Sequence, residues 1–240
     1  MKKIFFFLLV SATLFACSKN TDGVANPGTP GDVSYQIKKS SYNTGTTTYT
    51  YDASGRIKTK TYLGGERSEF EYQAGKVLEK EYDAAGILKV TYTYELNSNG
   101  IVEKETRSDM PGFSEIRLYN SDKQMVKFTI VENGGTSTGD YFYSNGNCDS
   151  ARFSSNGIWN TTIKNTYYTD KANVLGFESS GQFFWGKKSK NLIKSEQYFF
   201  SNGSVGEKEN YSYEYDAKGR VTKFTSEADN DLYITFYSYE

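Results

Sequence analysis

The chain has 240 residues, with 28 basic and 29 acidic side chains, no histidine and only two cysteines. A formal charge of −1 argues against the basic surface of a nucleic-acid-binding protein, so we expect no nucleic-acid partner. The lack of histidine excludes the serine–histidine–aspartate triad, the cysteine–histidine pair and histidine-ligated zinc. We therefore expect a protein that is not an enzyme and that uses no metal and no cofactor.

Residues 1–16 have the layout of a secretory signal peptide, with Lys2 and Lys3 ahead of a short apolar stretch. The tetrapeptide LFAC at residues 14–17 resembles the bacterial lipobox, in which the cysteine is acylated before cleavage. This resemblance predicts lipid attachment at Cys17 and a membrane anchor. The alternative is an ordinary signal peptide with a chance cysteine.

Residues 17–34 contain two of the three prolines and little apolar bulk, which is typical of a flexible tether. Ser18, and not an aspartate, follows Cys17. By resemblance to other lipoproteins, this implies delivery to the outer membrane. Whether the protein would face the periplasm or the cell surface stays open.

Residues 35–240 read as a single all-β domain. As far as Gly157, turn signals recur about 10–12 residues apart, which is typical of short strands in an all-β fold. Val, Ile, Thr, Tyr and Phe fill the intervals and suit a pleated sheet. The pattern predicts an antiparallel meander of repeated hairpins, forming either a strongly curled sheet or a barrel-like shell.

The predicted strands favour a soluble protein that is held at the membrane only by its lipid. Membrane-spanning strands need about 9–11 residues and an uncharged lipid-facing row. Rows such as Arg56, Lys58 and Lys60 would place charge in hydrocarbon or in the lumen. The segment from Tyr233 to Tyr239 has large side chains on both faces, so we expect it to be covered on both.

A repeated phrase explains how the hairpins are made. YTYDASGR at residues 49–56 returns as YEYDAKGR at residues 213–220. In each copy the aspartate can accept backbone hydrogen bonds and open a turn, and the glycine suits the left-handed position that closes it. We interpret the repeat as turn chemistry, and we expect function where the pattern breaks, around residues 157–190.

These hairpins resemble the Rhs/YD-repeat proteins, whose hairpins coil into large β shells. The lipobox, the tyrosine-rich hairpins and GKKSKNLIKS at residues 186–195 together resemble a family of small Bacteroidetes-type lipoproteins of unknown function with a porin-like fold. The resemblance covers roughly residues 35–240. It implies a fold and no activity.

The aromatic residues supply the candidate ligand-binding groups, because the chain has 21 tyrosines, 16 phenylalanines and two tryptophans. Phe184 and Trp185 precede Lys187 and Lys188, and Trp159 follows another turn. Exposed rings at strand ends could stack on sugars or apolar ligands. The alternative is cross-strand packing of these rings in the core. The lysines have the composition of an anion-binding loop but lack its spacing, so a basic surface loop is the favoured interpretation.

The sequence leaves three functions open. The first is a membrane-tethered envelope lipoprotein that binds a glycan or an apolar ligand, or acts as a scaffold, without catalysis. The second is an interaction module for other envelope proteins. The third, least favoured, is a hydrolase that uses only two carboxylates. A calcium site at residues 229–231 is less favoured than a polar hairpin turn.

Overall fold

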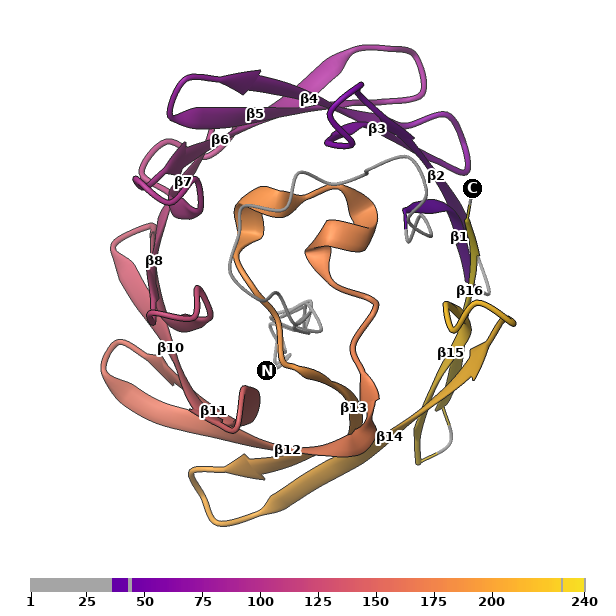
Figure 1. Cartoon of the computed structure of the whole chain (residues 1–240). Helices are drawn as coiled ribbons and strands as arrows, with labels where there is room; N and C mark the ends of the chain where they lie inside the picture. The colour runs from indigo at the N-terminus through magenta and orange to yellow at the C-terminus, as the bar shows by residue number, and fades with distance from the viewer. Residues whose placement is uncertain (1–35, 43–44, 230, 240) are drawn as a thin grey trace, which may run out of the picture.

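The chain forms a closed barrel of 16 antiparallel β-strands. The structure is a computed structural model that describes residues 36–42, 45–229 and 231–239. Each strand pairs with its neighbour in sequence, and β16 pairs with β1 to close the ring (Figure 1). The predicted all-β meander is confirmed, in its closed form. The predicted signal peptide, Cys17 and tether lie outside the described residues.

The strands are β1 Ile37–Tyr42, β2 Gly45–Tyr51, β3 Ile57–Tyr62, β4 Arg67–Gln73, β5 Lys76–Tyr82, β6 Leu88–Leu96, β7 Val102–Arg107 and β8 Ser114–Tyr119. They continue as β9 Met125–Glu132, β10 Gly135–Ser144, β11 Asn147–Ser155, β12 Ile158–Ala172, β13 Asn191–Phe200, β14 Val205–Tyr215, β15 Val221–Ala228 and β16 Asp231–Tyr239. Two short 3-10 helices, η1 Phe177–Ser180 and η2 Phe183–Trp185, lie between β12 and β13. Within the described ranges, no helix combines the length and the apolar character that a bilayer crossing requires.

The repeated phrase forms two equivalent hairpin turns, β2–β3 and β14–β15. In the second copy, Asp216 Oδ1 accepts hydrogen bonds from the backbone N–H groups of Lys218 and Arg220, both at 2.9 Å. Gly219 closes the turn with φ 76°. Asp52 makes the same contacts in the first copy. The turn interpretation of the phrase is therefore confirmed.

The connections between strands alternate between the two ends of the barrel, because successive strands run in opposite directions. One end carries the β2–β3, β4–β5, β6–β7, β8–β9, β10–β11, β12–β13 and β14–β15 connections. The paired residues Ile37 and Tyr239, which lie near the two termini of the described chain, are at the same end. We call this end the plug end. The opposite end, formed by the remaining hairpins, is the rim end.

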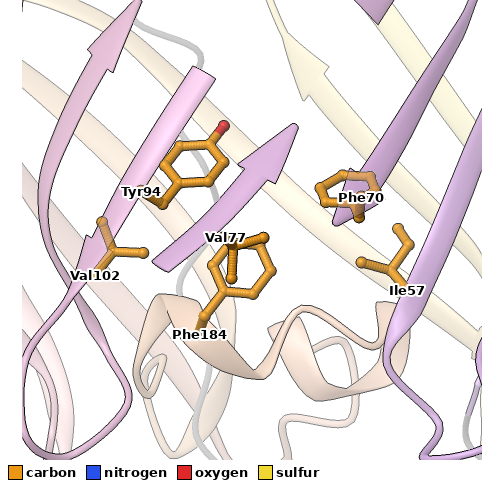
Figure 2. Packing of buried hydrophobic residues seen from close by; sticks show 6 residues of the cluster. All are labelled: Ile57, Phe70, Val77, Tyr94, Val102 and Phe184. Carbon is orange, nitrogen blue, oxygen red and sulfur yellow. The ribbon is translucent and has the colours of Figure 1, made fainter. Parts of the chain in front are cut away.

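The β12–β13 connection, residues 173–190, is the plug, because it folds into the barrel interior and does not extend outward (Figure 1). A barrel of 16 strands is too wide to be filled by the side chains of its own wall. The plug supplies the missing apolar surface. The main core therefore lies between the plug and one part of the wall, where Phe184 packs against Ile57, Phe70, Val77, Tyr94 and Val102 (Figure 2).

Charged side chains lie on both faces of the wall. On the inner face, Lys60 Nζ lies 3.3 Å from Glu79 Oε1. On the outer face, Lys80 pairs with Glu71 at 2.8 Å. The expectation that the last strand is covered on both faces is wrong, because Phe236 of β16 is 54% exposed.

Candidate functional site

The plug is held to three different turns of the plug end by backbone hydrogen bonds. The Ile57 N–H donates to the carbonyl of Gly181 at 3.0 Å, next to the β2–β3 turn. The Lys187 N–H donates to the Lys123 carbonyl at 2.8 Å in the β8–β9 turn. The Lys190 N–H donates to the carbonyl in the β10–β11 turn at 2.9 Å. These bonds satisfy buried backbone groups of a non-repetitive segment, and they fix the plug across the barrel mouth.

Phe184 is the apolar centre of the plug and is only 4% exposed. Its ring lies 5.6 Å from the Tyr94 ring in a stacked arrangement and 6.2 Å from the Tyr72 ring in an edge contact. Such aromatic pairs add to the free energy of burial. The structure therefore places Phe184 in the core, with almost no surface for a ligand (Figure 2).

Trp185 lies beside Phe184 and contacts the wall through two groups. Its ring lies 4.9 Å from the Tyr94 ring, and the guanidinium carbon of Arg117 lies 4.3 Å from its centroid. Arg117 is itself buried and pairs with Glu105 at 2.8 Å and with Glu115 at 2.7 Å. Burial raises the pKa of Glu115, while Arg117 opposes that rise. Trp185 thus joins the plug to a buried ion-pair network.

Lys188 is buried within the plug. Its ammonium lies 4.4 Å from the ring centroid of Phe177. Burial lowers the pKa of Lys188 to about 8, with Glu178 opposing the change. Burial also raises the pKa of Glu178. Lys187 is half-buried.

The interpretation of residues 186–190 as a basic surface loop is wrong for most of the segment. Ser189 is completely buried, and its hydroxyl accepts a hydrogen bond from the Cys148 N–H at 3.0 Å. Only Lys190 of this segment is exposed. The loop turns inward because the wide barrel leaves space that the wall side chains do not fill.

Trp159 lies apart from the other predicted binding residues. It is the second residue of β12, next to the β11–β12 turn at the rim end, and it is 39% exposed. Its indole N–H donates to Thr162 Oγ1 at 3.1 Å, and Arg152 lies 6.0 Å from its ring. The structure therefore brings Phe184, Trp185, Lys187 and Lys188 together in the plug and leaves Trp159 at the other end.

Sequence reasoning missed a carboxyl pair on the inner wall. Glu196 of β13 pairs in register with Glu209 of β14. Tyr211 donates to Glu196 at 2.6 Å, and the hydroxyl of Ser226 hydrogen-bonds to Glu209. Burial raises the pKa of Glu196, with the Tyr211 hydrogen bond opposing it. Only the strand register brings the two acids together, so no local motif could have revealed them.

The pair has the composition that a two-carboxylate hydrolase would need. Glu196 is only 7% exposed and Tyr211 only 4%. Tyr211 and Ser226 occupy oxygen atoms that a substrate would have to reach. The arrangement is therefore a covered hydrogen-bond network.

Other reactive groups are also poorly placed for chemistry. Cys148 is buried, and burial raises the pKa of its thiol to about 12, which leaves it in the unreactive thiol form at neutral pH. Within the described ranges, no group of three or more histidine, cysteine, aspartate or glutamate side chains could hold a metal ion.

Two solved structures resemble the fold closely. A porin-like protein from Bacteroides uniformis matches with a TM-score of 0.60 and 19% identity, covering 87% of this chain and 98% of its own. A porin-like protein from Bacteroides vulgatus matches with a TM-score of 0.57 and 13% identity, covering 85% of this chain and 99% of its own. No protein-family model matches the sequence, and no curated protein matches it. At these identities the likeness shows a shared porin-like barrel fold.

Proposed function

We propose that the protein is a membrane-tethered lipoprotein of the bacterial envelope, with a non-enzymatic binding or scaffold role. The plug is the observation that carries this proposal. Its backbone is bonded to three turns, and its aromatic side chains are packed into the wall. A barrel closed in this way at one end is suited to serve as a cup or a rigid platform, and it is poorly suited to serve as an open channel.

The outer wall supports placement of the barrel outside the bilayer. The pairs Lys80–Glu71 and Lys104–Glu95 lie on strands β4–β7 with exposed side chains. A lipid-facing row would carry a cost of a few kcal/mol for each such charge near the midplane. Several strands are also short for a membrane span, with six residues each in β1, β3, β7 and β8.

The anchor in this proposal is an acyl group on Cys17, followed by a tether over residues 17–34. Its support is the lipobox LFAC, together with a fold shared with porin-like proteins of Bacteroides. Delivery to the outer membrane follows from Ser18 in the same proposal. The Rhs/YD-like hairpins belong to the platform and have no separate activity.

Membrane fractionation and acyl labelling test the anchor. We expect the wild-type chain to incorporate a radiolabelled fatty acid and to sediment with membranes. Cys17→Ser should lose both properties, whereas Cys148→Ser should keep both, because Cys148 is a buried residue of the barrel. Membrane retention of Cys17→Ser without label would contradict the lipoprotein proposal.

A conductance measurement tests the proposal that the plugged barrel is a platform and not an open channel. We expect the acylated protein to give no stable single-channel current in planar bilayers. A reproducible conductance would show that the barrel spans the bilayer, and it would overturn the platform proposal.

Ligand binding in the barrel interior is a second candidate function, favoured by an aromatic cluster away from the plug core. Ile193, Tyr211 and Phe224 form this cluster on β13–β15, with Tyr167, Tyr213 and Tyr237 packed against it. Tyrosine combines an apolar ring with a hydroxyl, which suits glycans and apolar molecules alike.

Tryptophan fluorescence separates a binding role from a scaffold role. A Trp159→Phe variant retains only Trp185, which lies inside the barrel. We expect polysaccharide fragments or lipids that enter the barrel to shift its emission. An unchanged emission across such a panel would favour an interaction module for envelope proteins. Loss of the response in Tyr213→Ala, with retention in Tyr215→Ala, would place the ligand at the interior cluster.

A further inference from the structure

The rim end carries most of the large apolar side chains that the described part of the chain exposes. Eleven of them lie in rim connections or within three residues of a strand end there, and they come from seven of the eight rim hairpins. We call this set the apolar rim: Leu63, Ile87, Leu88, Ile116, Val131, Ile158, Trp159, Phe200, Val205, Leu232 and Tyr233. Exposures reach 72% for Ile158 and 69% for Leu63.

The plug end differs, although it is built from the same kind of hairpin. Of the exposed large apolar residues in the described ranges, only Leu118, Phe142, Tyr215 and Phe236 lie nearer to a strand end there. Its turns instead carry polar side chains such as Asp52 and Asp216. Scattered surface apolar residues need no explanation, but their gathering at one end of a barrel indicates an interaction surface.

We propose that the apolar rim docks on the surface of a lipid bilayer. A barrel end presents its hairpins as a ring, and one or two apolar side chains extend from each of seven hairpins. A protein partner needs a continuous, well-packed apolar centre. A bilayer surface is flat and fluid, so it can contact all points of a ring at once. Trp159 and Tyr233 are of the types enriched at membrane interfaces.

The chain outside the described barrel is long enough for this orientation. β1 begins at Ile37 at the plug end, and the predicted acyl site is Cys17, so this step rests on the proposed function. The 20 residue-to-residue steps from Cys17 to Ile37 could span about 65–70 Å when extended. The longest rim-to-plug strand of 15 residues, β12, rises only about 50 Å. A lipid anchor leaving from the plug end can therefore still reach a bilayer below the rim, and it raises the local concentration of that surface.

The charged side chains at the rim end indicate which kind of interaction would hold the rim on a bilayer. The rim connections carry the acidic side chains Asp109, Glu132, Asp229 and Asp231, and the basic Arg107 is paired with Asp109 at 2.8 Å. Such a rim has no excess of positive charge with which to attract anionic headgroups. Docking would rest on burial of apolar and aromatic side chains at the interface. It should therefore occur on zwitterionic vesicles and change little with salt.

Lipid quenching of tryptophan tests the proposal, because the chain has one tryptophan at the rim and one in the plug. The acylated full chain would be bound to phosphatidylcholine vesicles with brominated acyl chains. We expect at least half of the Trp159 emission to be quenched, and Trp159→Phe to remove that quenched component. Trp185→Phe should retain the quenched component. If that variant folds poorly, the quenching of Trp159 is obtained from the difference in emission between the wild type and Trp159→Phe.

Matched double variants test the whole rim. Ile158→Asp with Val205→Asp should lower the quenching of Trp159 at least threefold. Leu118→Asp with Phe142→Asp changes two exposed apolar residues near the plug end, and it should leave the quenching unchanged.

The outcomes separate this inference from the lipoprotein proposal. Failure of the wild-type chain to bind vesicles would contradict the anchor itself. Vesicle binding without quenching of Trp159 would keep the anchor and overturn the docking proposal. A blue-shifted Trp159 emission without lipid, together with a dimeric mass in solution, would also overturn it by assigning the rim to a second copy of the chain.

Discussion

The two ends of the barrel are made from the same hairpin unit, yet their side chains make different contacts. At the plug end, the turns are polar and the interior is filled by residues 173–190. At the rim end, the described connections are short, and apolar side chains extend from seven of the rim hairpins. The difference shows that turn chemistry determines where the chain reverses, whereas the residues beside each turn determine what that end contacts.

The comparison also separates residues that stabilise the fold from residues that are free to serve an interaction. Phe184 at the plug end and Phe200 at the rim end are the same residue type, and each lies beside a loop that contains glycine or serine. The first is 4% exposed and the second 39%. Stability should therefore depend on the plug end and depend little on the rim.

The largest expected effect comes from Phe184→Ala. Removal of a buried aromatic ring should lower the free energy of unfolding by about 3–5 kcal/mol. Phe200→Ala at the rim should change it by about 1 kcal/mol or less, because that ring is more exposed. Urea denaturation followed by circular dichroism measures both. Equal losses would show that the plug is no more important for stability than the rim.

The next effect comes from Gly181→Ala at the plug attachment. Gly181 has φ +68°, and an added Cβ would lie 2.6 Å from the Ile57 nitrogen and 2.8 Å from the Gly55 carbonyl oxygen. We expect a loss of about 3 kcal/mol in the free energy of unfolding.

Gly100→Ala is the matched control, because Gly100 has φ +73° with open space around a new Cβ. It should cost only about 1 kcal/mol from backbone strain. Similar losses in the two variants would mean that the plug can move away from the wall at little cost.

A smaller effect is a pH dependence caused by Lys188. Burial lowers its pKa to about 8, so between pH 8 and the unfolded value near 10.4 the unfolded chain binds the extra proton. Stability should then rise with pH across this window, by about 1 kcal/mol for each pH unit. Below pH 8 the ammonium is protonated in both states, so Lys188 causes no pH dependence there.

Cys148 acts in the opposite direction over the same range. Its thiol pKa is raised to about 12, so the unfolded thiol loses its proton first and stability falls with pH. The comparison should therefore be made in a Cys148→Ala background. There, Lys188→Met should remove the rise between pH 8 and 9.5. An unchanged slope would contradict burial of the ammonium.

The smallest expected effect is at the apolar rim. Leu63 is 69% exposed, so Leu63→Ser should change the free energy of unfolding by no more than about 0.5 kcal/mol. Thermal unfolding in the absence of lipid measures it. A loss above 2 kcal/mol would show that the rim is a structural contact, and it would weaken the contrast between the two ends.

The predicted hairpin turns and the structure agree at most positions, because each turn is a local event. Asp216 and Gly219 need only their own backbone neighbours to close a turn. The exception is the segment after β12, which ends at Ala172, because residues 173–190 fold into the barrel and form no hairpin turn. No local signal distinguishes a turn from a segment that folds inward.

The candidate binding residues were grouped by sequence position, and the structure separated them. Phe184, Trp185, Lys187 and Lys188 lie in the plug. Trp159, 26 positions before Trp185 in the printed sequence, lies at the opposite end because β12 runs from the rim end to the plug end. The Glu196–Glu209 pair depends on strand register, which a single sequence does not specify here.

By itself, the sequence determined the all-β class, the hairpin positions and the segment where the pattern breaks, because these depend on local turn chemistry and on alternation along each strand. Only the tertiary structure decided that the meander closes, that residues 173–190 turn inward, and that exposed apolar side chains gather at one end. Those features depend on the number of strands around the ring and on the direction of each, which are properties of the whole barrel.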